Sequence, residues 1–509
     1  MKKGQTHWVF PTLAKARSTL VCANVISPAR TIAYRTLLRV DAGRGFAADL
    51  LQSPEVSSLK EVDRRLATEL VMGVLRWRGE LDFQLAEVSG KSVERLDPEV
   101  VTILRLGLYQ VQFLERVPKS AAVDQAVEMV KAARKRSAAG FVNAVLRKCP
   151  AGKAGRFERF EDLDQAARAA VRRATPAWLL ERWGAASVPA ITQSVSKQLS
   201  GALSVDQLTT ANGLRTTDAR AASAEDVALR LAYASMQVPP TVLRVVNPAE
   251  NVSRLQEELA GEEISTRPGR FSLRALVVDS GNVQACRALK QGRVVLQDEA
   301  SQLIVDLLMP QRGERVLDLC AAPGIKAGQL AQALGKGTLV TSDVSASRLR
   351  TMARLLPRWV PEEVQWLPVR MDAARAFPLA CPFDRILLDA PCSGTGTLAR
   401  NPEIKWRLHP EDLRRLAETQ AQMLENALGA LGPGGRLVYA TCSLEPEENE
   451  GVVERVLEEH PACRLLSASE LSSRFPRLRP LFDSRGYLRT RPDLDAMDGF
   501  FAAVIARRA

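Results

Sequence analysis

The sequence lacks the features that mark membrane, secreted and metal-binding proteins. No apolar stretch approaches the ~20 uninterrupted residues that span a bilayer, and the first residues have no continuous apolar core of the signal-peptide type. The eight cysteines include no Cys-x-x-Cys pair and there are only three histidines, which argues against a disulfide framework and a bound metal. We therefore expect a cytoplasmic protein with no membrane partner and no metal.

Aromatic residues are also scarce. They make up 5% of the chain, which argues against a binding surface built mainly from aromatic stacking platforms. Hydrophobic residues nevertheless make up 46% and charged residues 25%, as in globular proteins. The 509 residues exceed the roughly 250–300 that one core accommodates, so we expect two or three domains.

Positive charge is in excess and is unevenly distributed. The 70 Lys and Arg residues outnumber the 58 Asp and Glu residues, and the net charge is +12. Residues 1–150 contain 24 of the basic and 15 of the acidic residues, so nine of the twelve net charges fall in the first third. Such a surplus indicates either a polyanionic partner or a solvated basic surface.

Helical periodicity dominates the first third of the chain. Residues 28–150 have apolar residues at helical spacing and almost no strand signals, which predicts an all-α domain. Residues 1–27 have no clear periodicity and are either a disordered extension or an over-long start. A breaker-rich stretch at 149–155 is typical of a linker.

Strand and helix signals are mixed in the rest of the chain. Residues 160–285 are predicted to form a small α/β connecting domain, with a helix at 252–260. Its strands are predicted at 241–246, 271–278 and 293–296. Residues 290–509 alternate short aliphatic runs with helical segments, which is typical of a Rossmann-like α/β domain with buried parallel strands. Those runs lie at 315–319, 337–343, 383–389 and 435–441.

A turn of small residues follows the first of these runs. It reads Asp318-Leu-Cys-Ala-Ala-Pro-Gly-Ile-Lys and matches neither Gly-x-Gly-x-x-Gly nor a P-loop. Ligands of open α/β sheets bind at this edge, where small side chains let them approach the backbone. Asp343 ends the next run and could accept both hydroxyls of an adenosine ribose, and Asp372 could bond an adenine amino group. Each acid alone is more often a cap or turn residue, but three at strand ends favour adenosine binding.

Two cysteines follow the last two runs, in Asp389-Ala-Pro-Cys-Ser-Gly-Thr-Gly and in Ala440-Thr-Cys-Ser. Cys392 and Cys442 are therefore expected at the same edge of the sheet as the nucleotide site, where a thiol of lowered pKa is a nucleophile. Free cysteines are otherwise most often small buried hydrophobic residues. We expect that of Cys22, Cys149, Cys286, Cys381 and Cys463.

Two thiols beside an acid suit methylation of cytosine at carbon 5. This carbon is too poor a nucleophile to take a methyl group from a sulfonium unless a thiolate first adds to carbon 6 and forms an enamine. Asp389 can hydrogen-bond ring nitrogen 3 and favour the adduct. A base then removes the proton at carbon 5, and the thiol is expelled. The spacing does not decide which cysteine makes the adduct.

These motifs resemble those of the Nol1/Nop2/Sun family of RNA cytosine-5 methyltransferases. Further signatures are Gln297-Asp-Glu-Ala-Ser-Gln-Leu, Arg400-Asn-Pro-Glu-Ile-Lys-Trp-Arg and Asp498-Gly-Phe-Phe, and together they span about 290–509. The first third, with Phe141-Val-Asn-Ala-Val-Leu-Arg, is similar to the NusB-like RNA-binding domain of the bacterial Sun branch. That branch methylates a cytosine of small-subunit (16S) ribosomal RNA.

The resemblance implies roles for individual residues. Cys442 would be the nucleophile, Cys392 would assist release of the methylated product, and S-adenosylmethionine would be the methyl donor. Ile325 stands where the family often has Gly, which matters if that position needs a positive φ. The residues implied to contact the donor are Cys320, Ala321, Ala322, Pro323, Gly324, Ile325, Lys326, Asp343, Asp372 and Asp389.

Two basic segments are candidates for RNA binding. In the first, Arg400, Lys405 and Arg407 could bind phosphates and Trp406 could stack on a base, the alternative being a solvated loop with an anchoring Trp. The second could grip the ribosomal RNA backbone or be only a solvated face. It consists of Lys131, Arg134, Lys135, Arg136, Arg147 and Lys148.

We therefore expect a monomeric, S-adenosylmethionine-dependent RNA cytosine-5 methyltransferase. Its three domains would be an all-α NusB-like domain, a small α/β connecting domain and a Rossmann-like catalytic domain. One rival is a non-catalytic RNA-binding factor, which the paired cysteines and strand-end acids disfavour. Another is a methyltransferase of DNA or of a small molecule, which the basic first third and the cysteine motifs disfavour.

Overall fold

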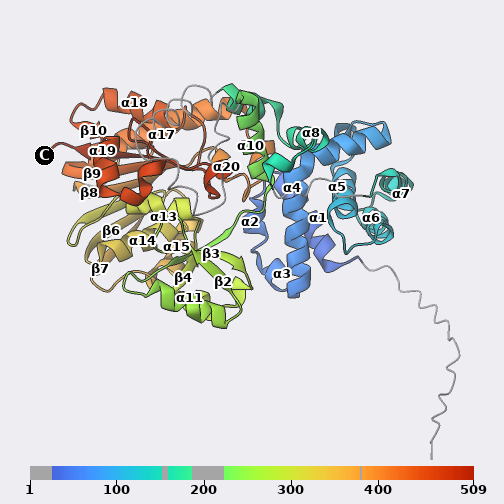
Figure 1. The fold of residues 1–509 in the computed structure, drawn as a ribbon, viewed down its shortest axis with the longest axis horizontal. Coiled ribbons are helices and arrows are strands. Elements are labelled where there is room, and N and C mark those ends of the chain that lie inside the picture. Colours follow the sequence, from blue (N-terminus) through green and yellow to red (C-terminus); the bar gives the residue numbers. More distant parts are fainter. Residues whose placement is uncertain (1–25, 152–158, 186–222, 379–380) are drawn as a thin grey trace, which may run out of the picture.

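The computed structural model describes residues 26–151, 159–185, 223–378 and 381–509. Figure 1 shows a helical part, formed mainly by the first third of the chain, beside a larger part that contains the β-sheets. The extension expected at 1–27 lies almost wholly outside the described residues, as does most of the linker expected at 149–155.

The helical part is built around one central helix, α5. Its helices are α1 (Pro28–Asp41), α2 (Ala47–Leu50), α3 (Pro54–Ser57), α4 (Glu61–Ser89), α5 (Pro98–Phe113), α6 (Lys119–Ala132) and α7 (Ala139–Lys148). Thirteen of the sixteen residues of α5 are buried, because α1, α4, α6 and α7 pack around it. Pro98 opens α5 in its first turn, where a proline removes no helical hydrogen bond. The all-α prediction is confirmed.

The same hydrophobic core continues past residue 150. Its further helices are α8 (Gln165–Arg173), the helical residues 177–185 and α10 (Ala224–Met236). Val171 and Tyr233 from these helices belong to the core cluster of the helical part. The helices before the small sheet therefore pack with the helical part, while the domain boundaries expected from the sequence remain predictions.

A small antiparallel sheet lies along the chain between the helical part and the large sheet. It consists of β1 (Thr241–Val245), β2 (Ser265–Pro268), β3 (Ala275–Ser280) and β4 (Val294–Leu296), with α11 (Val252–Gly261) and α12 (Arg287–Lys290). The strand order is β2-β3-β1-β4, and each neighbouring pair is antiparallel. The sequence analysis missed β2, because this strand is mostly exposed and ends in a proline, so no apolar alternation marks it.

The large sheet has the strand order β10-β12-β9-β8-β5-β6-β7. Its parallel strands are β5 (Arg315–Leu319), β6 (Gly337–Asp343), β7 (Val364–Arg370), β8 (Phe383–Asp389) and β9 (Leu431–Thr441). Its antiparallel strands are β10 (Cys463–Leu465), β11 (Leu488–Arg489) and β12 (Phe501–Arg507). The Rossmann-like prediction is confirmed. The chain runs from β5 to β6 on one side and returns through β8 on the other, so the strand order reverses at β5, where such sheets bind ligands.

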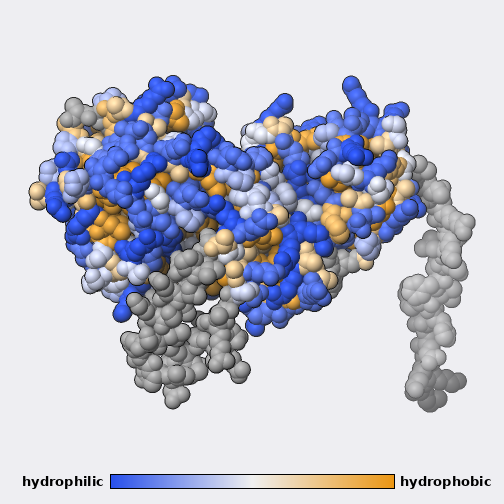
Figure 2. Space-filling view, turned by 90° about the horizontal axis from the view of Figure 1, so that it is seen from above, coloured by the Kyte–Doolittle hydropathy of each residue, from blue (hydrophilic) through white to orange (hydrophobic). Residues whose placement is uncertain are grey.

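Helices cover both faces of this sheet. One face carries α13 (Glu299–Asp306), α14 (Ile325–Leu334), α15 (Ala346–Leu355) and α19 (Ala468–Arg474), and the other carries α17 (Pro410–Ala430) and α18 (Glu450–Glu458). Among the described residues, no helix has the length and apolar character needed to cross a bilayer. The face shown in Figure 2 is mostly hydrophilic, with apolar patches separated by polar residues.

A short segment joins the catalytic part to the helical part. It contains α16 (Ile404–Arg407). The buried Lys405 Nζ donates hydrogen bonds to the carbonyls of Arg76 and Ala174, at 3.3 and 3.0 Å. Trp406 Nε1 donates to the Leu75 carbonyl at 3.0 Å, and Arg407 Nη2 donates to the Gly45 carbonyl at 2.8 Å.

The expected RNA contacts of this segment are therefore wrong. The side chains of Lys405, Trp406 and Arg407 bind main-chain carbonyls of the helical part instead of phosphates and a base. Arg400 binds carboxylates inside the catalytic part. The alternative, a solvated loop with an anchoring Trp, is also wrong about the loop, because these side chains bind the protein. It is right only about Trp406, which is an anchor. Basic and aromatic residues occur both at RNA-binding surfaces and at this junction, so their pattern in the sequence does not distinguish the two.

The second basic cluster lies on the surface of the helical part. Lys131 pairs with Glu128, and Lys135 pairs with Asp97 at 2.9 Å. The other members of the cluster, Arg134, Arg136, Arg147 and Lys148, are exposed. Their expected grip on ribosomal RNA remains a prediction.

We expect the substitution Lys405→Met to remove a pH-dependent part of the stability. Burial, together with the neighbouring Arg76, lowers the pKa of Lys405 from 10.5 to about 7 in the folded protein. Between these pH values the unfolded chain binds more protons at this position, so the wild-type free energy of unfolding gains a contribution that rises with pH.

Urea unfolding of both proteins, in steps from about pH 7 to about pH 10, checks this expectation. The control Lys131→Met removes an exposed lysine and should leave the wild-type slope unchanged. Parallel pH profiles for wild type and Lys405→Met would contradict the proposed effect of burial.

Candidate active site

The turn after β5 has an unusual backbone conformation at two residues. Cys320 has a φ of 59° and Gly324 a φ of 106°, both in the left-handed region. A Cβ on Gly324 would lie 2.8 Å from Met352 Cγ, so only glycine fits there. Ile325 begins α14 in helical conformation, so the family's usual Gly is not required by φ at that position.

Two buried acids flank this turn. Asp318 in β5 is 1% exposed, and neither of its carboxylate oxygens has a hydrogen-bond partner among the described residues. Burial, and then the charge of Asp389, raises the pKa of Asp318 well above its usual range. Asp343 at the end of β6 is 2% exposed, and its Oδ2 lies 3.5 Å from Arg348 Nη1. Three carboxylate oxygens beside the turn thus lack a hydrogen-bond donor among the described residues, while Asp343 Oδ1 accepts from Ser345 N–H at 2.8 Å.

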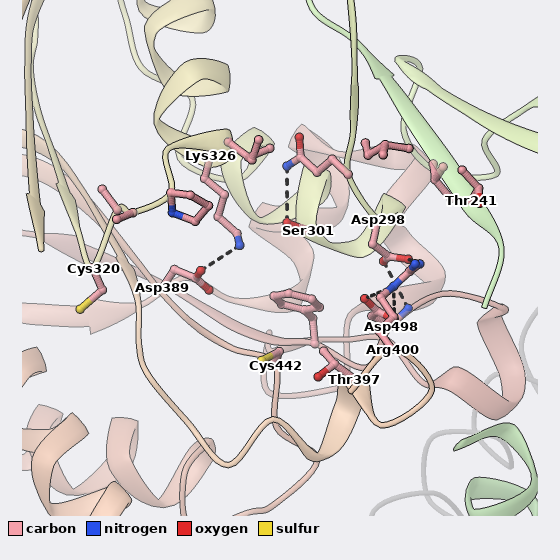
Figure 3. Close-up of a pocket in the computed structure, with 18 of the residues that line it drawn as sticks. Thr241, Asp298, Ser301, Cys320, Lys326, Asp389, Thr397, Arg400, Cys442 and Asp498 are labelled. Carbon is pink, nitrogen blue, oxygen red and sulfur yellow. Dashed lines mark hydrogen bonds and ion pairs between the residues drawn. The ribbon is translucent and has the colours of Figure 1, made fainter. Parts of the chain in front are cut away.

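Lys326, in the first turn of α14, reaches across the cavity to the end of β8. Its Nζ lies 2.8 Å from Asp389 Oδ2, and Figure 3 shows the two side chains pointing toward each other. Burial opposes the charge of Lys326, but the neighbouring carboxylate of Asp389 outweighs it and raises the pKa of the lysine. The pair is therefore an ion pair at neutral pH, and it holds the Asp389 carboxylate in one orientation.

The two strand-end cysteines meet in the same cavity. Cys392 follows β8, Cys442 follows β9, and their Sγ atoms are 3.3 Å apart. Both line a cavity of about 880 Å³ together with Lys326 and Asp389. The hydrogen bond to Cys442, followed by burial, raises the pKa of Cys392 well above its usual range. Cys392 is therefore a thiol at neutral pH and can donate a hydrogen bond to the sulfur of Cys442.

The remaining cysteines are not part of this pair. Cys320 lines the cavity, but burial and the surrounding acids, led by Asp389, raise its pKa to about 12. Cys149, Cys286 and Cys463 are buried, as expected. Cys381 is exposed, so the expectation that it is buried was wrong. Cys22 lies outside the described residues.

Two glycines lock the cysteine loops together. Gly396 N–H donates to the Cys442 carbonyl at 2.9 Å, and Gly499 N–H donates to the Gly396 carbonyl at 2.8 Å. A Cβ on Gly396 would lie 2.0 Å from the Gly499 oxygen, which no side chain can accommodate. The loop that carries Cys392 therefore depends on contact with the segment that carries Phe500, another residue of the cavity wall.

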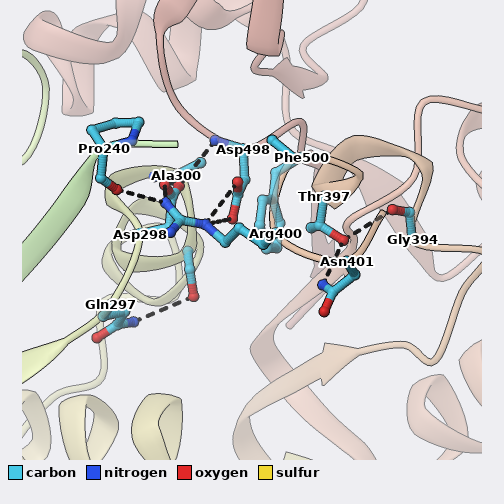
Figure 4. A network of polar contacts seen from close by, with 12 residues as sticks. Pro240, Gln297, Asp298, Ala300, Gly394, Thr397, Arg400, Asn401, Asp498 and Phe500 are labelled. Carbon is cyan, nitrogen blue, oxygen red and sulfur yellow. Dashed lines mark hydrogen bonds and ion pairs between the residues drawn. The ribbon is translucent and has the colours of Figure 1, made fainter. Parts of the chain in front are cut away.

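A buried charge network forms the other wall of the cavity (Figure 4). Arg400 Nε lies 2.8 Å from Asp498 Oδ2, and Arg400 Nη2 lies 2.7 Å from Asp298 Oδ2. Nη2 also donates to the Pro240 carbonyl at 3.1 Å, so the network reaches the start of the small sheet. Burial and the nearby Asp298 raise the pKa of Asp498 to about 7. These bonds fix three separate segments around the cavity.

Comparison with known proteins decides the family. Residues 305–506 match the family model described as "16S rRNA methyltransferase RsmB/F", and residues 27–150 match the NusB family. The chain is 30% identical over 484 residues to "Probable ribosomal RNA small subunit methyltransferase B" of Bacillus subtilis (strain 168), which covers 94% of this chain and 98% of that protein. The chain belongs to the RsmB family of small-subunit ribosomal RNA methyltransferases.

Other relatives agree with this assignment. Ribosomal RNA small subunit methyltransferase B of Yersinia pestis bv. Antiqua (strain Angola) is 30% identical over 487 residues, covering 94% of this chain and 98% of that protein. The crystal structure of PH0851 has a TM-score of 0.68 with 22% identity, covering 94% of this chain and 99% of the other. That likeness shows that the RsmB chain shares its fold over most of its length.

The RsmB site fits S-adenosylmethionine, the methyl donor of this family. Asp318 and Asp343 hold three buried carboxylate oxygens that no hydrogen-bond donor of the described residues satisfies. Buried acceptors of this kind are costly unless a ligand supplies donors or positive charge. The donor molecule offers ribose hydroxyls, an amino group and a sulfonium, so its chemistry matches the vacant acceptors of this RsmB chain.

The structure gathers most of the residues that the sequence analysis selected. Among them, the residues that line the single cavity are Cys320, Ala321, Ala322, Pro323, Ile325, Lys326, Asp389, Cys392 and Cys442. Gly324 forms the backbone behind this wall, and Asp343 lies beside the turn. Asp372 lies apart: its Oδ1 accepts from Ala374 N–H at 3.0 Å, and its Oδ2 is 3.4 Å from Arg375. Its adenine contact remains a prediction for this RsmB chain.

Sequence reasoning missed other parts of the RsmB cavity. Asp318 was counted only as a strand-end acid, although it lines the cavity with two unpaired oxygens. Asp298, Arg400 and Asp498 stood in quoted signatures, but nothing showed that they form one network. The sequence signal of this network was that opposite charges occur in separate motifs. Only the tertiary structure reveals which of these charges meet.

We expect the substitution Asp343→Ala to weaken S-adenosylmethionine binding by about ten- to a hundredfold, since a hydrogen bond to a charged group contributes about 1.5–3 kcal/mol. Isothermal titration calorimetry measures the dissociation constant. Asp372→Ala serves as the comparison and should cause a smaller loss, because this side chain is 38% exposed and already bound within the protein. An unchanged dissociation constant for Asp343→Ala would contradict the role given to this acid.

Proposed function

We propose that the protein methylates carbon 5 of one cytosine in 16S ribosomal RNA through a covalent cysteine adduct. The observation that carries the proposal is the contact of Cys392 with Cys442, at 3.3 Å, in the cavity that also holds the Lys326–Asp389 ion pair. Hydrolysis and simple binding need no second thiol at this distance. A reaction that forms and later breaks a carbon–sulfur bond uses both.

The turn at 320–326 and the neighbouring acids would hold S-adenosylmethionine. Asp343 would accept the ribose hydroxyls, Asp372 would bond the adenine amino group, and Asp318 and Asp389 would offer negative charge. When bound, this group supplies a methyl group on a positively charged sulfur. The small residues Ala321 and Ala322 of this turn line the cavity and would let such a ligand approach the main chain closely.

Cys442 would attack carbon 6 of the cytosine as a thiolate. The sulfur–carbon bond forms, and the electron pair moves to carbon 5, which then takes the methyl group. Ring nitrogen 3 and a carboxylate both only accept hydrogen bonds, so Asp389 would have to take a proton, from Lys326 across their 2.8 Å contact, before it bonds that nitrogen and stabilises the adduct. Loss of the proton at carbon 5 restores the double bond as the bond from carbon 6 to Cys442 breaks.

Cys392 would assist this last step. Its raised pKa keeps it protonated at neutral pH, so it suits hydrogen-bond donation to Cys442 and later release of the product better than the first attack. This role for Cys392 leaves the first attack to Cys442, as the family resemblance implies.

The helical part would bring the ribosomal RNA to this cavity. Supporting observations are the NusB family match over residues 27–150 and the basic surplus of the first third. The enzyme would act as a monomer, and a ribosomal RNA substrate would be met in the cytoplasm. The rival functions, an RNA-binding factor without catalysis and a methyltransferase of DNA or of small molecules, become outcomes of the test.

The test uses radiolabelled S-adenosylmethionine and small-subunit ribosomal RNA from a methylation-deficient source. Digestion and chromatography then identify the labelled nucleoside. Label in 5-methylcytidine at one site is the expected result. Label in another nucleoside, or in DNA offered in parallel, would overturn the proposal. An absence of label on naked RNA and on assembling small subunits alike would favour the non-catalytic factor.

Substitution of the two cysteines should give different defects. We expect Cys442→Ala to abolish methylation, because no thiolate remains at the attacking position. We expect Cys392→Ala to form the adduct but to stall its release, leaving protein covalently bound to RNA. Denaturing gel electrophoresis with labelled RNA detects that complex. A fully active Cys442→Ala enzyme would refute the assignment of the nucleophile.

A further inference from the structure

A fully buried carboxylate lies beneath the two cysteine loops. Glu448 Oε1 accepts hydrogen bonds from Ser393 N–H at 2.8 Å and from Gln420 Nε2 at 3.0 Å. Glu448 Oε2 accepts from the Ser443 hydroxyl at 2.5 Å and from the Ser393 hydroxyl. The carboxylate therefore receives four hydrogen bonds, two of them from one cysteine loop and one from the other.

The serines that bind Glu448 directly follow the two cysteines in the chain. Ser393 Oγ and Ser443 Oγ are 3.0 Å apart, and the preceding thiols of Cys392 and Cys442 are 3.3 Å apart. The two loops thus meet twice, once through their thiols in the cavity and once through their hydroxyls below it. Glu448 bridges the lower contact.

Glu448 is itself held firmly from the side away from the cavity. The Tyr439 hydroxyl donates to the Glu448 carbonyl at 2.6 Å. Gln420 in α17, which binds the Glu448 side chain, also donates to the Pro391 carbonyl at 2.9 Å. Glu448 is not among the described residues that line the cavity, so it touches neither a base nor a cofactor bound there.

We propose that Glu448 is a positioning residue that joins the two cysteine loops, keeps their thiols in contact and makes Cys442 the one that attacks. The first two effects stand on the hydrogen bonds alone. The consequence for attack rests on the proposed function.

The carboxylate is suited to this task because it accepts hydrogen bonds only. Both hydroxyls and the Ser393 N–H must point at it, which fixes the direction of each loop. An amide in its place has only one accepting oxygen, so the hydroxyls of Ser393 and Ser443 would have to turn and accept from its N–H groups, and the negative charge would be lost. Its negative charge also adds to the causes that raise the pKa of Cys392, after the hydrogen bond to Cys442 and burial. Thiolate formation is thereby disfavoured at Cys392.

Thiol labelling of the full-length enzyme tests the proposal without RNA or methyl transfer. Limiting iodoacetamide followed by peptide mass spectrometry gives the order in which Cys392 and Cys442 react at several pH values. Dibromobimane, which bridges two neighbouring thiols, reports whether they remain in contact. In the wild type we expect Cys442 to react first and the bridge to form.

In Glu448→Gln we expect the pH profile of Cys392 labelling to move to lower pH, because the nearby negative charge is lost. For each pH unit of that shift, the ratio of the Cys442 labelling rate to the Cys392 labelling rate should fall by about tenfold. The bridging yield should fall as well. The matched control is Glu445→Gln, which removes another buried carboxyl group of the same loop. The Glu445 carboxyl binds Arg182, Trp183 and Thr395 but neither of the serines that Glu448 joins, so this variant should change the labelling order and the bridging yield much less than Glu448→Gln does.

Wild-type labelling and bridging in a folded Glu448→Gln would overturn the proposal, and so would the same change in both variants, since the effect would then be a general loss of packing. If Glu448→Gln does not fold, Ser443→Ala provides the test. It removes one donor and leaves the carboxylate, and it should shift labelling in the same direction by less. No shift in Ser443→Ala would likewise overturn the proposal.

Kinetics on 16S ribosomal RNA add an independent readout. Misplaced reacting groups cost about a hundredfold in rate, so kcat of Glu448→Gln should fall by about that factor while KM for RNA stays unchanged. A rise in KM with an unchanged kcat would contradict a positioning role. A wild-type enzyme inactive on every RNA would refute the proposed function, yet the labelling results would still decide the role of Glu448.

Discussion

The parallel pairing of β8 with β9 is the constraint on which the whole site depends. The register places Asp389 opposite Ala440, so the loops that carry Cys392 and Cys442 leave the sheet at the same level. A slip of one residue would move one loop by about 3.3 Å along the strand and turn alternate side chains to the opposite face. Two thiols 3.3 Å apart do not survive such a slip. The aliphatic side chains buried on both faces of these strands therefore fix the distance on which the proposed chemistry depends.

The wall of the cavity and the junction between the two parts of the molecule share one segment. Thr397 and Arg400 line the cavity, and a few residues later Lys405 and Trp406 bind main-chain carbonyls of the helical part. Since the segment is short and its partners are main-chain atoms, the helical part cannot move away without displacing the wall. The basic helical part is thus held in a fixed position relative to the thiols.

The sequence patterns predicted the elements whose side chains repeat regularly. Aliphatic runs located β5, β6, β8 and β9, and their carboxyl ends located the cavity. The antiparallel β12 was not predicted, because its continuous apolar run does not distinguish a strand from a buried helix. Lys405 was misinterpreted because a sequence does not reveal whether the acceptor of a cation is a phosphate or a carbonyl. Asp318 and Glu448 owe their importance to partners, or to the lack of partners, that only the tertiary structure determines.

The charges around the cofactor turn explain why the site suits a cation. Asp318, Asp343 and Asp389 surround Cys320, while Lys326 pairs with only one of them. Gathering carboxyl groups in a buried place costs free energy, as the raised pKa of Asp318 shows, and a positive ligand among them offsets this cost. A methylated sulfonium carries that charge and its demethylated product does not, so the same acids hold the donor more strongly than the product. The acids also keep Cys320 protonated, with its pKa raised to about 12 by burial and their charge, so it does not compete with the paired thiols.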